Sequence, residues 1–151
     1  GETTEIAPAF VRLARPAGVI ALIDPETSEA VAEYHGGSSP LTAMVPGRYL
    51  VRTLEGFEWP GQIELKWGQT FVLKSSILRV RPEQIPAGGI VEAVVRRADG
   101  GHTATVVFDV NNTDLGLPAG RYLVSLSSRP DTPAIAVDLG EDAVHELNLP
   151  R

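Results

Sequence analysis

The sequence predicts an all-β protein that consists of two tandem, small antiparallel β-sandwich modules. Three observations predict it: a high content of turn-forming residues, short segments of β-forming residues at regular spacing, and an internal repeat. The 151 residues include 15 Gly and 12 Pro, and this load of turn formers favours many short strands over long helices. With 43% hydrophobic residues, the chain is able to bury a core.

The internal repeat consists of two signatures that alternate along the chain. The pentapeptide Gly-Arg-Tyr-Leu-Val begins at Gly47 and again at Gly120. A second segment, which opens with Gly and ends with Arg-Pro, covers residues 1–16 and 68–82, and a partial third copy begins at Gly140. The spacing of roughly 70 residues gives the size of one module.

The phase of the repeat sets the predicted module boundaries. Each Gly-led segment follows a Gly-Arg-Tyr-Leu-Val segment, so we interpret it as the last strand of a module. This places module 1 at residues 7–75 and module 2 at residues 76–151. Residues 1–6 are then the expected tail strand of an upstream module, and we infer that the chain is part of a longer protein.

The expected strands are rich in β-forming residues, and clusters of Gly, Pro, Asn and Asp separate them. The segment 70–81 contains no Gly or Pro and is predicted to be one continuous strand that closes module 1 and opens module 2. The best helical candidate, residues 26–34, is short. The expected strands cover residues 19–24, 30–35, 47–55, 62–67, 70–81, 89–97, 103–109, 120–126, 134–139 and 143–149.

Two tyrosines occupy matching positions in the repeat. Tyr49 and Tyr122 each follow the turn glycine by two residues. A tyrosine at such a corner of a sandwich packs its ring inward and donates its hydroxyl to the backbone of a neighbouring turn. We therefore expect these side chains to stabilise the fold rather than to bind a ligand.

The pattern Leu-Pro-x-Gly-x-Tyr-x-Val at residues 117–124, which residues 45–51 match in part, is followed by a final strand that opens with Gly and resembles a known group of modules. It is similar to the transthyretin-like and carboxypeptidase-regulatory-like sandwiches and to the related collagen-adhesin B-type repeats, which share an immunoglobulin-like architecture. The resemblance covers nearly the whole chain as two copies. It implies accessory modules of a bacterial extracytoplasmic protein, located in the periplasm or on the cell surface or secreted.

Charge and composition argue against several classes of function. The net charge is −6, and the 13 basic residues are scattered among 19 acidic ones, so nucleic acid is not an expected partner. The longest apolar run, residues 17–23, is too short for membrane insertion. There is no cysteine, and the three histidines lack metal-binding spacing. No catalytic residues are predicted, and the protein is not expected to be an enzyme.

Three aromatic residues of module 1 are the candidate ligand-binding residues. Phe57 and Trp59 lie in a loop that ends in Trp59-Pro60-Gly61, and Trp67 follows shortly after. The tryptophans have no counterparts in module 2, and exposed loop aromatics are typical of contacts with glycans or proteins. The alternative is that they cover the end of module 1 or the contact between modules.

A calcium site is the one metal site that the sequence suggests. Asp109, Asn111 and Thr113 place side-chain oxygens at alternate positions, as a calcium loop does, and Asp114 stands where such a loop has its Gly. The loop lacks the usual Gly and the final Glu, and an Asn-rich turn explains the same residues. Apart from calcium, no cofactor is expected.

The leading functional expectation is a non-enzymatic spacer or adhesion-type segment of a larger protein, with other domains of that protein as its partners. The alternative is a module that binds carbohydrate or protein through the loop from Phe57 to Trp59.

Overall fold

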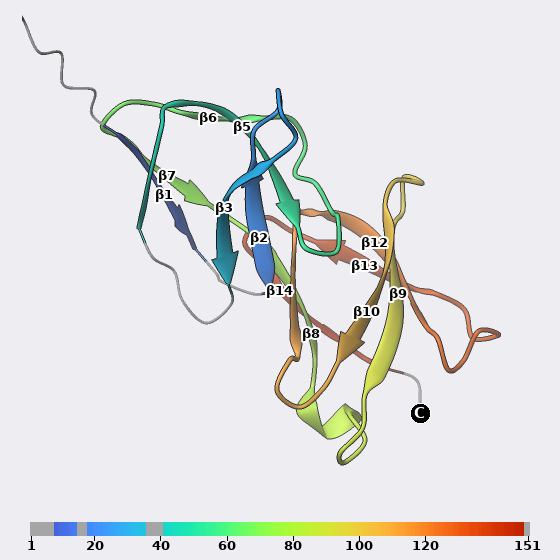
Figure 1. The fold of residues 1–151 in the computed structure, drawn as a ribbon. Helices are drawn as coiled ribbons and strands as arrows, with labels where there is room; N and C mark the ends of the chain where they lie inside the picture. Colours follow the sequence, from blue (N-terminus) through green and yellow to red (C-terminus); the bar gives the residue numbers. More distant parts are fainter. Residues whose placement is uncertain (1–7, 15–17, 36–40, 150–151) are drawn as a thin grey trace, which may run out of the picture.

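The computed structural model describes residues 8–14, 18–35 and 41–149, and these form an almost entirely β structure (Figure 1). Four sheets make two sandwich-like pairs, one from the N-terminal half of the chain and one from the C-terminal half. The N-terminal sandwich contains β1 (Ala9–Leu13), β2 (Val19–Ile23), β3 (Ala30–His35), β4 (Thr42–Met44), β5 (Gly47–Thr53), β6 (Ile63–Leu65) and β7 (Thr70–Leu73). The C-terminal sandwich contains β8 (Ser76–Val80), β9 (Val91–Arg97), β10 (Thr103–Phe108), β11 (Asp114–Leu117), β12 (Gly120–Leu126), β13 (Ile135–Leu139) and β14 (Val144–Leu147), with a 3-10 turn at Pro82–Gln84.

The two sandwiches have the same topology. The sheets are β4-β1-β7 and β3-β2-β5-β6 in the first, and β11-β8-β14 and β10-β9-β12-β13 in the second. In each sandwich the first and last strands pair in parallel and the other pairings are antiparallel. Each strand of the second sandwich is therefore the counterpart of the strand seven places earlier, and the predicted all-β sandwich architecture is confirmed.

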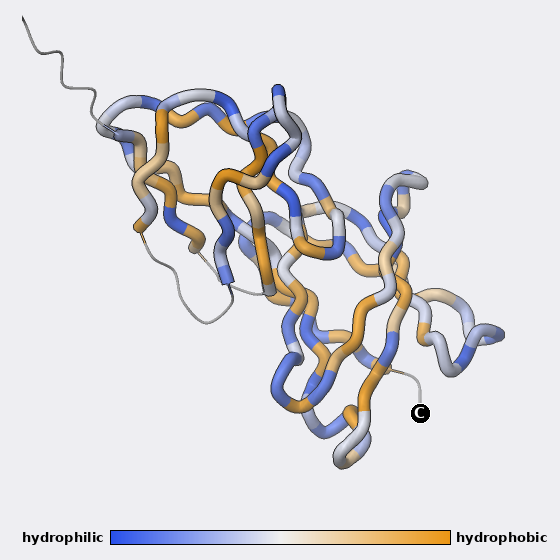
Figure 2. The backbone as a smooth tube through the Cα atoms, viewed as in Figure 1, coloured by the Kyte–Doolittle hydropathy of each residue, from blue (hydrophilic) through white to orange (hydrophobic). Residues whose placement is uncertain are grey.

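Each sandwich has its own apolar core. Alternation along the strands explains it: β1 buries Ala9, Val11 and Leu13 and turns the residues between them outward, as the period of two requires. Figure 2 shows hydrophobic residues concentrated along the strands and hydrophilic ones in the connecting loops. Burial of each Leu, Ile or Val side chain stabilises the fold by roughly 1.5–3 kcal/mol.

The structure corrects three details of the sequence-based prediction. The helical candidate at 26–34 is wrong, because residues 24–29 form a tight hairpin turn, with Ser28 at φ 60°, and β3 follows directly. The predicted continuous strand 70–81 is interrupted at Lys74-Ser75 between β7 and β8. The short strands β1, β4 and β11 were not predicted. The proposed tail strand at 1–6 lies outside the described residues.

Both tyrosines of the repeat lock a corner of their sandwich, as predicted. The Tyr49 hydroxyl donates to the Val45 carbonyl at 2.6 Å, and the Tyr122 hydroxyl donates to the Pro118 carbonyl at 2.6 Å. The two sites differ in burial: Tyr122 is fully buried, whereas Tyr49 is half-buried. Burial raises the pKa of Tyr122 to about 12, so its hydroxyl stays a donor throughout the physiological pH range.

The substitution Tyr122→Phe is expected to destabilise the protein by about 1–3 kcal/mol, because it leaves the Pro118 carbonyl without its partner in a buried site. The matched substitution Tyr49→Phe is expected to cost less than about 1 kcal/mol, because water reaches the half-buried corner and replaces the hydroxyl. Urea unfolding of the two variants measures the difference. Equal losses of unfolding free energy in the two variants would show that burial does not determine how much the tyrosine hydroxyl contributes to stability.

Candidate functional site

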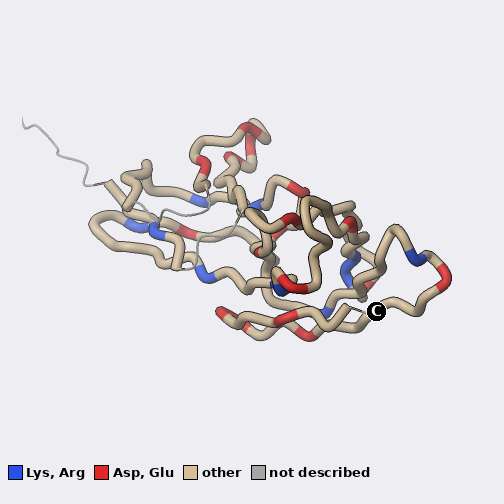
Figure 3. Tube along the Cα trace, turned by 90° about the horizontal axis from the view of Figure 1, so that it is seen from below, with Lys and Arg blue, Asp and Glu red and all other residues tan. Residues whose placement is uncertain are grey.

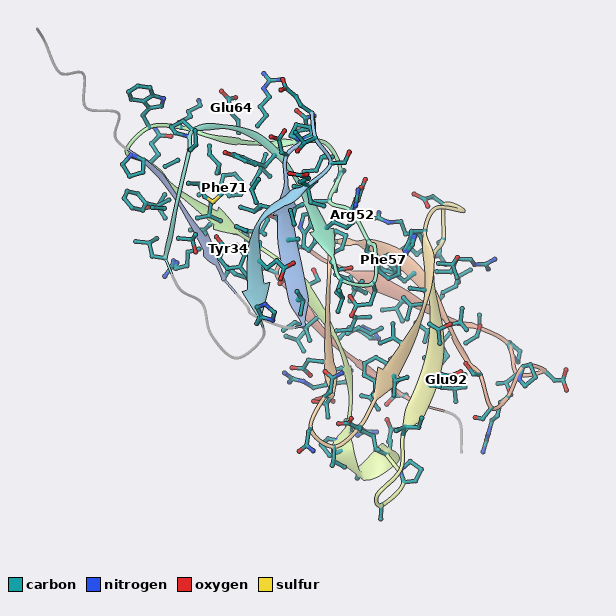
Figure 4. The ribbon with its side chains drawn as sticks, in the orientation of Figure 1. Tyr34, Arg52, Phe57, Glu64, Phe71 and Glu92 are labelled. Atoms are coloured by element: carbon teal, nitrogen blue, oxygen red, sulfur yellow. The ribbon has the colours of Figure 1, made fainter. Side chains whose placement is uncertain are left out.

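The loop between β5 and β6, residues 54–62, crosses from the N-terminal sandwich to the C-terminal one. Phe57 at its tip is fully buried and belongs to the core of the C-terminal sandwich. Figure 4 shows its side chain pointing toward the second sandwich. The candidate site is therefore a junction between the sandwiches, and we call residues 54–62 the junction loop.

Aromatic contacts hold Phe57 in place. Its ring meets the His102 ring edge-to-face at a centroid distance of 4.9 Å and the Tyr122 ring at 5.9 Å with an interplanar angle of 77°. Such edge-to-face pairs are favoured by the ring quadrupoles and stabilise by about 0.5–1.5 kcal/mol beyond the area that they bury. The corner tyrosine of the second sandwich thus forms part of the receiving surface.

Polar groups of the second sandwich bind the backbone of the junction loop. His102 Nε2 lies 2.6 Å from the Glu55 carbonyl oxygen, and the Arg97 guanidinium donates to the Glu58 carbonyl. The same guanidinium lies over the Tyr122 ring, 5.8 Å from its centroid, which adds a cation–π contact. These bonds give hydrogen-bond partners to the Glu55 and Glu58 carbonyls, which strand pairing within the first sandwich does not use.

The local sequence shapes the junction loop. The Thr53 hydroxyl accepts a bond from Phe57 N at 3.0 Å, and Thr53 N donates to the Phe57 carbonyl at 2.9 Å. Gly56 between them has φ +100°, and a Cβ at this position would lie 2.7 Å from His102 Nε2. Glycine is therefore required both for the turn and for the close approach of the second sandwich.

The structure places the three candidate ligand-binding aromatics, Phe57, Trp59 and Trp67, in three different environments. Phe57 is inaccessible, and Trp59 is half-buried against the core of the N-terminal sandwich, with its Nε1 donating to the Lys74 carbonyl at 3.2 Å. Trp67 is 53% exposed and lies beyond β6, away from the junction loop. Phe57 thus lies at the contact between the sandwiches, and Trp59 packs against the core of its own sandwich.

A cleft of about 700 Å³ lies beside the junction loop. Its walls carry polar and charged groups and the side of one indole ring. Two of the lining residues form an ion pair, in which Arg52 Nε donates to Glu58 Oε1 at 2.9 Å. The residues that matter most for its chemistry are Arg52, Glu58, Trp59, Arg97, Asp99 and His102.

The segment proposed for calcium forms a turn between β10 and β11. Asp109 Oδ1 accepts a bond from Asn111 N at 2.8 Å, and Asp109 and Asn112 pair through their backbones. Asp114 lies in β11, where its carboxylate binds Arg79 of β8 at 2.7 and 2.9 Å. The described residues hold no group of three or more His, Cys, Asp or Glu that could bind a metal ion. Residues 109–112 therefore form a turn closed by backbone bonds between Asp109 and Asn112.

The ion pair of Asp114 makes stability depend on acid pH. The Arg79 guanidinium, through its hydrogen bonds, holds the pKa of Asp114 below its ordinary value despite partial burial. An unpaired Asp has a pKa of about 4, so the ion pair contributes its full stabilisation above about pH 4. Because the pKa of Asp114 is lower in the folded protein, this stabilisation is lost as the pH falls through the lowered value.

Asp114→Asn is therefore expected to flatten the fall in unfolding free energy between neutral and acid pH. Urea unfolding across this range checks it, with Asp138→Asn, which removes a carboxylate from an exposed ion pair, as the control. If the unfolding free energy of Asp114→Asn fell with pH as steeply as that of the native protein, the ion pair of Asp114 would not be the cause of the acid dependence.

Sequence reasoning missed Arg97 and His102. His102 is an exposed residue of the turn between β9 and β10, and no local sequence pattern marks it as a contact. Its role depends on a loop of the other sandwich, with a separation of 47 residues between His102 and Glu55, so only the three-dimensional arrangement shows it.

No protein-family model matches the chain, and no curated protein matches it. Among solved structures, the chain is similar to one described as "The Bacillus anthracis TIE protein", with 14% sequence identity and a TM-score of 0.34. The similarity covers 93% of this chain and 33% of that one, so this chain spans about a third of its length. None of the described segments forms a helix long and apolar enough to span a membrane.

Proposed function

We propose that this chain is a non-enzymatic structural segment of a larger bacterial extracytoplasmic protein, in which two stiffly joined sandwiches set the spacing of other domains. The observation that carries the proposal is the insertion of Phe57 from the first sandwich into the core of the second. A buried aromatic anchor across a junction resists separation, because separation exposes both the ring and its pocket to water.

A second attachment, the chain link beside the junction loop, supports stiffness. Only Lys74 and Ser75 separate β7 from β8, and Ser75 and Ser76 are fully buried. The Ser76 hydroxyl donates to the Gly140 carbonyl, which fixes the start of β8 against the last connection of its own sandwich. The covalent link and the inserted loop, which the bond from Trp59 Nε1 to the Lys74 carbonyl connects, together restrict movement between the sandwiches.

The finer family assignment, to transthyretin-like, carboxypeptidase-regulatory-like or collagen-adhesin B-type modules, is part of this proposal. It is supported by the repeated Tyr corner bonds and by the identical strand order of the two sandwiches. Periplasmic, cell-surface or secreted location and attachment to other domains of the same protein follow from that assignment. Figure 3 shows basic and acidic residues interspersed along the chain rather than gathered into a basic stripe, which favours protein partners over nucleic acid.

Relaxation of backbone amide nitrogens by NMR tests the stiff junction. A rigid segment predicts that amides of both sandwiches report one common, anisotropic tumbling of the whole particle. Two separate and faster correlation times, one for each sandwich, would reject the proposal.

A second candidate, binding of a glycan or protein at the junction, is favoured by the cleft beside Trp59. Planar polar side chains around an aromatic ring suit the hydroxyl groups and apolar faces of sugars. We expect Trp59→Ala to weaken such binding by about 2 kcal/mol or more, while Trp59→Phe keeps most of the packing. Titration of cell-wall glycan fragments by calorimetry checks this. If no fragment produced heat of binding, glycan binding would be rejected and the spacer role would be the remaining proposal.

A further inference from the structure

One sheet of the N-terminal sandwich turns an apolar face outward. This is the sheet β4-β1-β7, in which alternate residues point away from the core because side chains along a strand have a period of two. On β1 the residues between the buried ones are Phe10 and Arg12, and on β7 they are Thr70 and Val72. We call this surface the N-terminal sheet face, and it consists of Phe10, Arg12, Leu41, Ala43, Val45, Thr70 and Val72.

The apolar side chains of the N-terminal sheet face are strongly exposed. Leu41 is 58% exposed, Val45 is 74% exposed and Val72 is 36% exposed. Strand pairing places Arg12 opposite Val72, and the register of β4 places Leu41 on the other side of Arg12. The guanidinium of Arg12 therefore stands between two exposed apolar side chains, and Figure 1 shows β1 on the side of its sandwich away from the C-terminal sandwich.

The same face of the C-terminal sandwich is polar at the corresponding positions. Arg79 of β8 is the counterpart of Arg12, and it pairs with Asp114 of β11 and with Glu146 of β14. The Asp114 carboxylate accepts two bonds from the Arg79 guanidinium, at 2.7 and 2.9 Å. The C-terminal sandwich thus shows the arrangement of this face when it is adapted to water, which is an arginine with a carboxylate on each side.

In the N-terminal sandwich both carboxylates are replaced by apolar residues. Leu41 stands where the other face has its Asp, and Val72 stands where the other face has its second acid. Within the described part of the chain, no ion pair includes Arg12. The neighbouring stretches 15–17 and 36–40, which lie outside the described residues, contain no Asp or Glu. An arginine set in an apolar surface is suited to pair with a carboxylate that another molecule brings.

We propose that the N-terminal sheet face binds another protein, through an apolar strand that carries one carboxylate. That carboxylate pairs with Arg12 as Asp114 pairs with Arg79, and apolar side chains on both sides of it cover Leu41 and Val72. An extended strand presents alternate side chains on one face, so apolar, acidic and apolar residues at every second position provide this pattern. The proposal does not depend on the spacer role.

Charge decides between this occupant and two others. A second copy that met this surface through its own N-terminal sheet face would bring a second Arg12, and like charges in a contact oppose binding. Anionic lipid is bound by clusters of four or more basic residues, whereas this face carries one. An acidic strand supplies both the opposite charge and the apolar cover.

Titration of the intact chain with two strand peptides, followed in proton–nitrogen correlation spectra, tests the proposal. One peptide is acetyl-Val-Thr-Asp-Thr-Val-amide, and the other has Asn in place of Asp. We expect the Asp peptide to shift amide signals of β1, β4 and β7, with a dissociation constant at least about tenfold lower than that of the Asn peptide, because only the carboxylate forms a charged pair with Arg12. Equal affinities, or no shift in these strands at millimolar peptide, overturn the proposal.

Val72→Glu supplies the matched variant, because it introduces the residue type that Glu146 provides in the C-terminal sandwich. The new carboxylate pairs with Arg12 within the chain, so we expect binding of the Asp peptide to be lost while the urea midpoint stays unchanged. Val107→Glu, at a 41% exposed valine of β10, is the control and is expected to bind as the native chain does. Retained binding by Val72→Glu, or lost binding by Val107→Glu, overturns the assigned surface.

The other two occupants are separate outcomes of the same series. Vesicles of phosphatidylcholine and phosphatidylglycerol that bind the native chain but not Val72→Glu, with neither peptide bound, would assign the face to a membrane. A dimer in sedimentation velocity that Val72→Glu dissociates would assign it to a second copy. Either result overturns the proposal of an acidic strand.

Discussion

Replacing Phe57 with alanine is expected to lower the unfolding free energy by about 3–5 kcal/mol, the range for removal of a buried phenylalanine. The ring is fully buried among residues of the C-terminal core although its backbone belongs to the N-terminal sandwich. The substitution therefore leaves a cavity in the core of the C-terminal sandwich. It also removes the contact that holds the junction loop of the N-terminal sandwich in place.

The same variant is expected to separate the unfolding of the two sandwiches. Calorimetry should resolve one transition for the native chain and two for Phe57→Ala, because loss of the anchor removes the coupling between units. Phe71→Ala, which truncates a half-buried ring at the edge of the N-terminal core, is the control for loss of a phenylalanine away from the junction. If Phe71→Ala showed two unfolding transitions and Phe57→Ala showed one, Phe57 would not be the residue that couples the two sandwiches.

Gly56→Ala is expected to destabilise the junction by about 2–5 kcal/mol, as the sum of backbone strain and overpacking. Alanine resists φ +100°, and its Cβ would lie 2.7 Å from His102 Nε2. The imidazole must move, which breaks its contacts with Phe57 and with the Glu55 carbonyl.

Gly100→Ala provides the matched control. Its φ is +85°, and nothing lies within 4 Å of a Cβ at that position, so only the backbone term of about 1–2 kcal/mol applies. Urea unfolding of both variants measures the difference. Equal losses would mean that the approach of His102 to Gly56 does not constrain the junction.

Much of the fold could be predicted from local patterns. Alternation and flanking turns placed β3 at residues 30–35, and the repeated pentapeptide located β5 and β12 together with their corner tyrosines. These features depend on residues near one another in sequence. The short strand β11 was missed because Gly116 and flanking polar residues hide its β character, and with it the pairing of Asp114 with Arg79.

The role of the junction loop could not be predicted in the same way. Composition shows that Phe57 and Trp59 are apolar, but an exposed loop aromatic and one covered by another sandwich have the same local sequence. What decides between them is the pocket formed by Tyr122 and His102, whose residues come from β12 and from the end of the β9–β10 hairpin. Burial at a contact between units is a property of the assembled structure rather than of a segment.

A distance measurement between the two sandwiches tests whether the junction loop holds them in one fixed orientation. The chain contains no cysteine, so Glu64→Cys and Glu92→Cys create the two labelling sites for spin labels, one on each sandwich (Figure 4). Pulsed electron spin resonance of the doubly labelled protein is predicted to give a single narrow distance distribution that broadens when Phe57→Ala is added. A broad distance distribution in the protein with Phe57 intact would contradict a fixed orientation of the two sandwiches.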